Sequence, residues 1–180
     1  MTVVVLPFTE RVIFTAAIKD DNPELREAAT RGIPCISYAE AVGALTREHK
    51  TITVSGSHGK STTTALVALA LIEGYANPTV IVGTTLRELN GSNYRRGASP
   101  YLVLEADEWN KSFLNYSPHI AVITNIDAEH LDTYGTSKEV ERTFREYLKK
   151  VSADGAIVAN ADDPGARRVL KNFKRRVVWY

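Results

Sequence analysis

The segment Ser55-Gly56-Ser57-His58-Gly59-Lys60-Ser61-Thr62 combines residue types that bind phosphate groups. Glycines let backbone N–H groups turn toward an anion, a helix N-terminus adds partial positive charge, and a lysine adds a full one. Lys60 is placed to contact phosphate oxygens, and the hydroxyl of Ser61 is placed to ligate Mg²⁺. The pattern is the short form G-x-x-G-K-S, because Val54 stands where the longer form has its first glycine. It predicts a phosphate-binding loop; the alternative is a tight strand-to-helix connection.

Two further polar clusters follow apolar runs of the chain. Glu105-Ala106-Asp107-Glu108 follows residues 101–104, and Asn125-Ile126-Asp127-Ala128-Glu129-His130 follows residues 120–124. In a parallel sheet the ligand site lies beyond the C-terminal ends of the strands. We therefore expect these clusters and the phosphate loop to lie at the same edge of one sheet.

Within these clusters, Glu105 adjoins its strand and should face the phosphate loop, which favours a role as Mg²⁺ ligand over a solvated turn. Asp107 and Glu108 fit a solvated acidic turn as well as a functional role. His130 alone would be a surface or helix-capping histidine, but its place after a strand makes it a candidate ligand.

The elements that must position these residues form an alternating pattern of apolar strands and helices. Strands are predicted at residues 51–55, 79–82, 101–104, 120–124, 156–159 and 177–179, and helices at 62–73, 137–151 and 164–173. Such alternation predicts an α/β fold with a doubly wound, mostly parallel sheet, and the loop makes it the P-loop NTPase type. In the second helix Ser137 is the expected N-cap, and one apolar face is expected in the core: Val140, Phe144, Tyr147, Leu148 and Val151.

Residues 1–49 differ from the rest and resemble the tail of a separate, Rossmann-like α/β unit. They contain an apolar run at 12–14, a helix that starts at Asn22-Pro23 and a short strand near 33–37, with a linker expected at 44–50. Residues 50–180 would form the central domain. Because residues 177–180 read as a buried strand with nothing after it, we expect both ends to be truncated.

Composition excludes several classes of function. The 180 residues are 44% hydrophobic with a formal net charge of +1, so no long-range field indicates nucleic acid or an anionic membrane as partner. The apolar run at 65–72 is too short to span a bilayer, and a cytoplasmic location is the default. The single cysteine, Cys35, lies in an apolar setting and is expected to pack inside the protein.

Taken together, these motifs resemble the Mur ligase family, ATP-dependent enzymes that join amino acids or peptides to the muramic acid carboxylate of cell-wall precursors. The resemblance covers almost the whole chain. The sequence GSHGKSTT is similar to the branch that joins L-alanine to UDP-N-acetylmuramate or to the related muropeptide-recycling branch, as are residues 105–134 and Asn160-Ala161-Asp162-Asp163-Pro164. Glu129 departs from the family, which usually has aspartate before the histidine.

The resemblance implies a set of roles. Lys60 would hold the β- and γ-phosphates of ATP; Ser61 and Glu105 would ligate Mg²⁺, and His130 a second Mg²⁺. The phosphate cradle would comprise Gly56, Ser57, His58, Gly59, Lys60, Ser61 and Thr62. The implied reaction is phosphoryl transfer to the carboxylate of UDP-N-acetylmuramate, followed by attack of the amine of L-alanine on the acyl phosphate.

Alternatives stay open. A family member has three domains, and this chain resembles the end of the UDP-sugar-binding domain and most of the ATP-binding domain. It could therefore be an inactive or non-catalytic nucleotide-binding module, or depend on a partner chain for the missing domains. A P-loop kinase or simple ATPase is a third class, although the cluster around His130 is not required by such enzymes.

Overall fold

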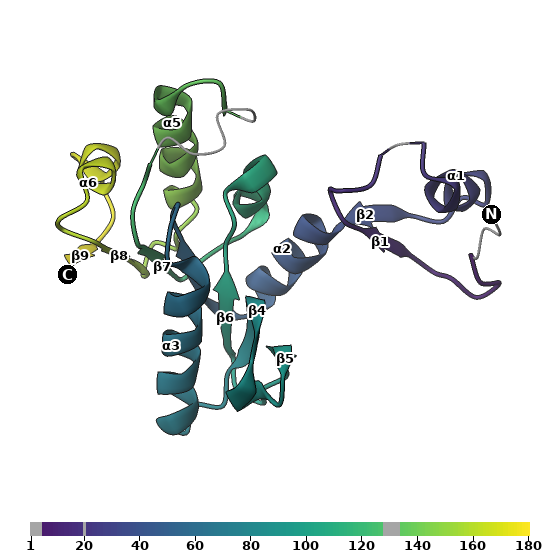
Figure 1. Ribbon diagram of the computed structural model, residues 1–180, viewed down its shortest axis with the longest axis horizontal. Helices are drawn as coiled ribbons and strands as arrows, with labels where there is room; N and C mark the ends of the chain where they lie inside the picture. The colour runs from purple at the N-terminus through teal and green to yellow at the C-terminus, as the bar shows by residue number, and fades with distance from the viewer. Residues whose placement is uncertain (1–4, 20, 128–133) are drawn as a thin grey trace.

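The computed structural model describes residues 5–19, 21–127 and 134–180. A small two-stranded parallel sheet, β1 (Val12–Phe14) and β2 (Cys35–Ser37), carries α1 (Pro23–Thr30). Figure 1 shows this unit to one side of a larger sheet, with α2 (Tyr38–Glu48) leading from one to the other.

The larger sheet has seven strands in the order β5-β4-β6-β3-β7-β8-β9. Every pair in it is parallel except β4 with β5, which confirms the predicted mostly parallel sheet. The edge strand β5 was not predicted, because its sequence Ser-Asn-Tyr-Arg has no apolar run. The strands are β3 (Lys50–Ser55), β4 (Thr79–Leu86), β5 (Ser92–Arg95), β6 (Tyr101–Glu105), β7 (Ile120–Ile123), β8 (Ala156–Ala159) and β9 (Val177–Trp179).

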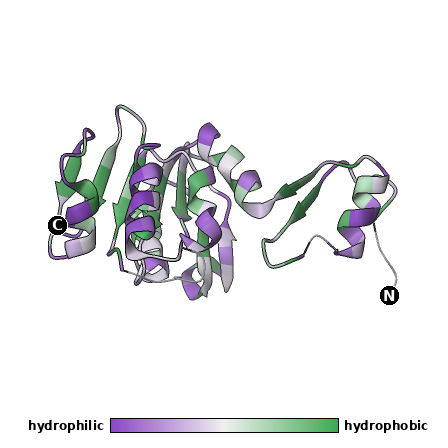
Figure 2. Ribbon diagram, turned by 90° about the horizontal axis from the view of Figure 1, so that it is seen from above, coloured by the Kyte–Doolittle hydropathy of each residue, from purple (hydrophilic) through white to green (hydrophobic). Residues whose placement is uncertain are grey.

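Helices cover both faces of this sheet, as a doubly wound fold requires. On one face α3 (Lys60–Glu73) packs through Ala68 against Val80 and Val103, near η1 (Arg87–Leu89). The other face packs against α2 and three further helices: η2 (Trp109–Asn115), α5 (Ser137–Leu148) and α6 (Pro164–Leu170). Figure 2 shows hydrophobic residues concentrated in the strands between these helices.

The predicted apolar face of α5 is buried, as expected from its spacing. Phe113 of η2 stacks on Tyr147 with ring centroids 4.5 Å apart and meets Phe144 edge-on at 5.1 Å. The hydroxyl of Tyr147 donates to Thr53 of β3, so this aromatic cluster connects α5 to the central strand of the sheet. The N-cap of α5 is Thr136, whose hydroxyl accepts from the Glu139 amide, and not the predicted Ser137.

The N-terminal unit corrects two further predictions. Most of the linker expected at 44–50 is helical, since residues 44–48 form the second half of α2, while Lys50 begins β3. A capping box starts α2, in which Ser37 and Glu40 bond each other's backbone amides. Cys35 is exposed, because β2 belongs to a sheet of only two strands. The predicted helix start is confirmed, since Asn22 caps α1 and Pro23 occupies its first turn.

The topology places a ligand site beside β3. The chain leaves β3, builds β4 and β6 on one side, and then crosses to β7 on the other side. Such a reversal opens a crevice beyond the carboxyl ends of the strands, where doubly wound proteins bind ligands. Val54 of β3 is in register with Glu105 of β6, and Ser55 with Ile123 of β7, so all three predicted clusters begin at this edge.

Candidate active site

The loop between β3 and α3 has a shape that only its glycines allow. Gly56 has φ +138°, and a Cβ there would lie 2.2 Å from Thr124 Oγ1 and 2.6 Å from the Asn125 carbonyl oxygen. Gly59, the N-cap of α3, is left-handed with φ +78°. The first amides of α3 lack acceptors within the helix and carry its positive dipole end, which favours anion binding at this end of the loop.

The chain that follows β7 holds this loop in place. The Asn125 side chain accepts from the His58 amide at 2.8 Å and donates to the His58 carbonyl at 2.9 Å. The backbone carbonyl of Asn125 accepts from the Ser57 amide at 3.2 Å, and the Thr124 hydroxyl donates to the His58 carbonyl at 2.7 Å. The backbone of the loop is thus fixed from a neighbouring strand.

Lys60 folds back over the loop that precedes it. Its ammonium donates to the Gly56 carbonyl at 2.7 Å and to Glu108 Oε1 at 3.0 Å, and lies 3.0 Å from Glu108 Oε2. The two side chains are only 14% and 3% exposed. The ammonium is therefore fixed at the loop and is not a freely solvated surface cation.

Glu108 is a site residue that sequence reasoning left undecided. Its neighbour Asp107 is exposed, whereas Glu108 is 2% exposed and turned toward the loop. Burial raises the pKa of the Glu108 carboxyl, and the nearby Lys60 charge opposes that rise. A carboxylate in this position balances the lysine charge while no phosphate is bound.

Glu105 lies beside the first turn of α3, as predicted. Its Oε1 accepts a hydrogen bond of 2.9 Å from the Ser61 hydroxyl, and its Oε2 accepts one of 2.6 Å from the Gly83 amide on β4. An octahedral Mg²⁺ with ligands at about 2.1 Å holds adjacent oxygens about 3 Å apart. The Ser61 and Glu105 oxygens already have the spacing of two adjacent ligands, so these residues fit the ion.

Ser61 and Glu105 supply two oxygen atoms, the kind of ligand that Mg²⁺ takes from proteins. In the part of the chain that the structure describes, no group of three or more His, Cys, Asp or Glu side chains forms a metal cluster. Mg²⁺ usually takes one or two protein ligands and completes its shell with phosphate oxygens and water. The predicted ligand His130 lies outside the described residues.

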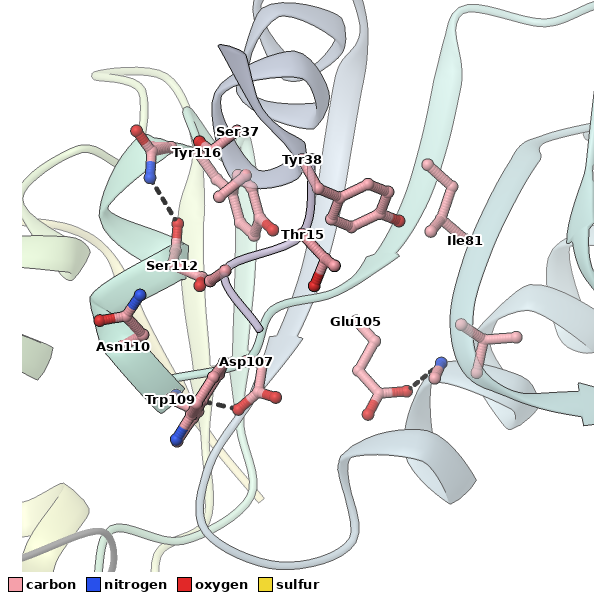
Figure 3. Close-up of a pocket in the computed structure, with 15 residues that line it drawn as sticks. Thr15, Ser37, Tyr38, Ile81, Glu105, Asp107, Trp109, Asn110, Ser112 and Tyr116 are labelled. Carbon is pink, nitrogen blue, oxygen red and sulfur yellow. Dashed lines mark hydrogen bonds between the residues drawn. The ribbon is translucent and has the colours of Figure 1, made fainter. Parts of the chain in front are cut away.

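A cavity of about 330 Å³ opens in front of Glu105. Figure 3 shows Glu105 at the end of β6, and Asp107 and Trp109 after it, on one side of this cavity, with Thr15 after β1 and Tyr38 at the start of α2 on the other. The Trp109 amide donates to Asp107 Oδ1 at 3.0 Å, which fixes the turn that forms one wall. A molecule in this cavity would lie next to the predicted metal ligands.

The remaining predicted residues also lie at the loop. Thr62 is exposed in the first turn of α3, and Ser57 and His58 precede it with their amides engaged by Asn125. Their binding of phosphate stays a prediction. Asn125 was predicted only as the first residue of its polar cluster, with no role of its own, and Gly83 was not singled out from the sequence.

A parallel sheet with a phosphate loop at its switch point defines a protein of the P-loop class. Within that class the chain belongs to the Mur ligase family: the Mur ligase middle domain matches residues 54–180, and the catalytic domain of the Mur ligase family matches residues 2–50.

Individual relatives agree with this assignment. UDP-N-acetylmuramate–L-alanine ligase of Arthrobacter sp. (strain FB24) is 44% identical over 93% of this chain and 36% of its own length. The same enzyme of Caldicellulosiruptor saccharolyticus is 44% identical over 95% of this chain and 38% of its own. The chain thus spans little more than a third of the length of the curated relatives it matches.

Solved structures show the same fold. The UDP-N-acetylmuramate-alanine ligase MurC of Thermotoga maritima superposes with a TM-score of 0.79 and 33% identity, over 89% of this chain and 37% of that one. A UDP-N-acetylmuramate:L-alanyl-gamma-D-glutamyl-meso-diaminopimelate ligase from Neisseria meningitides gives a TM-score of 0.84 at 22% identity, over 94% of this chain and 58% of that one. This second match is a likeness of fold.

Among the described helices, none is both long and apolar enough to cross a membrane.

Proposed function

We propose that this chain carries the phosphate- and metal-binding part of an ATP-dependent ligase that joins L-alanine to the carboxylate of UDP-N-acetylmuramate. The observation that carries the proposal is the contact of Ser61 with Glu105 beside Lys60, in a chain 44% identical to such ligases. Residues 1–49 would belong to the UDP-sugar-binding domain and residues 50–180 to the ATP-binding domain. The setting would be the cytoplasm, where peptidoglycan precursors are made for cell-wall growth and division.

In this proposal each residue acts on a stated part of the reactants. Lys60 binds the β- and γ-phosphates of ATP together with the first amides of α3. Ser61 and Glu105 would hold Mg²⁺ and His130 would hold a second ion, and the bound metal would supply positive charge to offset that of the transferred phosphoryl group. The cavity in front of Glu105 would receive the acceptor, so that its carboxylate can attack the γ-phosphate, release ADP and form an acyl phosphate. The amine of L-alanine then attacks the acyl carbon, and the amide bond forms as inorganic phosphate leaves and the amine loses a proton to solvent.

The same residues support two alternatives that differ in their amine substrate or in turnover. The muropeptide-recycling ligases of this family would use a peptide as amine. A nucleotide-binding module would bind Mg²⁺ and ATP without turnover. Because this chain spans only 36–38% of the length of these relatives, turnover needs to be tested on the chain itself.

The experiment is calorimetric binding of ATP with and without Mg²⁺, followed by phosphate release with UDP-N-acetylmuramate, L-alanine, both or neither. We expect Mg²⁺-dependent binding, and release only when both substrates are present. Release that needs a tripeptide in place of L-alanine indicates the recycling ligase, release without an amine indicates a kinase or ATPase, and binding alone indicates the module. Absence of ATP binding contradicts all of these assignments.

A further inference from the structure

Gly83 lies on β4, where this strand runs beside β6 and its last residue Glu105. Its amide donates the 2.6 Å hydrogen bond to Glu105 Oε2, while Oε1 accepts from the Ser61 hydroxyl. Figure 3 shows the first of these bonds as the dashed line beside Glu105. The two carboxylate oxygens are therefore assigned to different partners.

The Glu105 carboxylate can occupy its position only because residue 83 has no side chain. A Cβ on Gly83 would lie 2.8 Å from each Glu105 oxygen and 2.9 Å from the carboxyl carbon, closer than real Cβ contacts. Gly83 is not one of the glycines with a left-handed backbone, so its conformation does not itself require glycine. What requires glycine here is the approach of the carboxylate.

A glutamate side chain has three rotatable bonds, and without a fixed contact its carboxylate would sample many positions at the end of β6. The Gly83 amide removes this freedom by holding one oxygen, which turns the other toward Ser61. Metal sites need such support, because ligands must be held close to their working geometry by neighbouring hydrogen bonds.

We propose that Gly83 is a positioning residue for metal binding: it holds the Glu105 carboxylate so that Oε1 and the Ser61 hydroxyl together receive the Mg²⁺ of the nucleotide. This inference rests on the proposed function. It adds that a residue on β4, outside the phosphate loop and the acidic cluster, sets the metal affinity of the site.

The test is Gly83→Ala, with Thr84→Ala, an exposed neighbour on the same strand, as matched control. The clash of Gly83→Ala is with the end of a flexible side chain, so the fold should accept it and thermal unfolding should stay close to that of the wild type. Calorimetry measures ADP binding in excess Mg²⁺ and again in excess EDTA. We expect Gly83→Ala to weaken binding in Mg²⁺ at least tenfold and to change binding in EDTA less than twofold, and Thr84→Ala to change neither.

Equal binding of ADP in Mg²⁺ by wild type and a folded Gly83→Ala protein overturns the proposal, as does equal loss with Mg²⁺ and with EDTA. A crystal structure of Gly83→Ala without ligands separates this inference from the proposed function. It should show the Glu105 carboxylate moved away from Ser61; a carboxylate still bonded to Ser61 overturns the positioning role whatever the wild type binds. A wild type that binds ADP equally with and without Mg²⁺ overturns the proposed metal site itself.

Discussion

The ammonium of Lys60 and the carboxylate of Glu108 form a buried ion pair, with Nζ 3.0 Å from both carboxylate oxygens. The pair crosses from the first turn of α3 to the start of η2, and the Tyr134 hydroxyl donates to the Glu108 carbonyl. The cation expected to bind phosphate thus already has a counterion inside the protein. A phosphate bound by Lys60 would compete with Glu108 for the same N–H donors.

Glu108→Gln should strengthen binding of ADP in EDTA by about fivefold, because glutamine keeps the size of the side chain but removes a negative charge next to the anion site. Calorimetry of the two proteins at one salt concentration measures the change. Glu105→Gln serves as the comparison, since its charge lies beside Ser61 and not beside Lys60. Weaker binding by Glu108→Gln would show that Glu108 orients Lys60 toward the phosphate.

Glu108 should also make stability depend on pH. Because its pKa is raised in the folded state, the unfolded chain loses this proton first as pH rises from about 4. The Glu108 carboxyl therefore contributes most to stability at low pH. The difference in free energy of unfolding, wild type minus Glu108→Gln, should fall as pH rises through this window. Urea unfolding of both proteins between pH 4 and 7 measures this difference; an increase with pH would contradict the burial effect.

Lys60→Ala should abolish binding of ATP phosphates, since it removes the full positive charge of the loop. An exposed loop lysine would contribute little to the fold, but Lys60 is largely buried, so this change should also cost about 1–3 kcal/mol of stability. The double variant Lys60→Ala with Glu108→Gln should regain part of the stability and none of the binding. Denaturant unfolding and calorimetry separate the two effects, and near-normal ATP turnover by a folded Lys60→Ala protein would refute the site assignment.

Asn125→Ala should loosen the phosphate loop. It removes both side-chain hydrogen bonds to the backbone of His58, at a cost of about 1–2 kcal/mol of stability. Binding of ADP should weaken to a similar extent with Mg²⁺ and with EDTA, in contrast to Gly83→Ala, because the backbone that Asn125 holds, at His58, is proposed to bind phosphate and not the metal. A loss confined to binding in Mg²⁺ would instead connect Asn125 to the metal site.

The sequence predicted the features that rest on periodic apolar residues or on a local motif. The six predicted strands of the larger sheet are present, and the buried face of α5 follows from its helical spacing. Cys35 shows where such reasoning fails: its apolar neighbours suggest burial, but burial depends on how many strands and helices cover β2. A local sequence pattern does not show how many strands and helices will cover β2.

The same limit explains why the sequence predicted a role for Glu105 but left Glu108 undecided. Glu105 ends a strand, so its direction follows from the sheet. Glu108 lies after the strand, where Asn110 and Lys111 adopt left-handed conformations with φ 51° and 57°. That turn decides which of two adjacent carboxylates is buried, and it depends on tertiary packing of η2, including Phe113 in the core. Gly83 could not be found either, because its role depends on the pairing of β4 with β6.

The cavity in front of Glu105 has walls from two sheets that are joined through α2. A molecule that touches both Tyr38 and Trp109 would spend part of its binding free energy on holding the two units in one relative orientation. By thermodynamic linkage the reverse also holds: whatever fixes that orientation raises the affinity of the cavity by the same factor. The affinity of this cavity for such a molecule would therefore depend on the angle between the two units as much as on the side chains that line it.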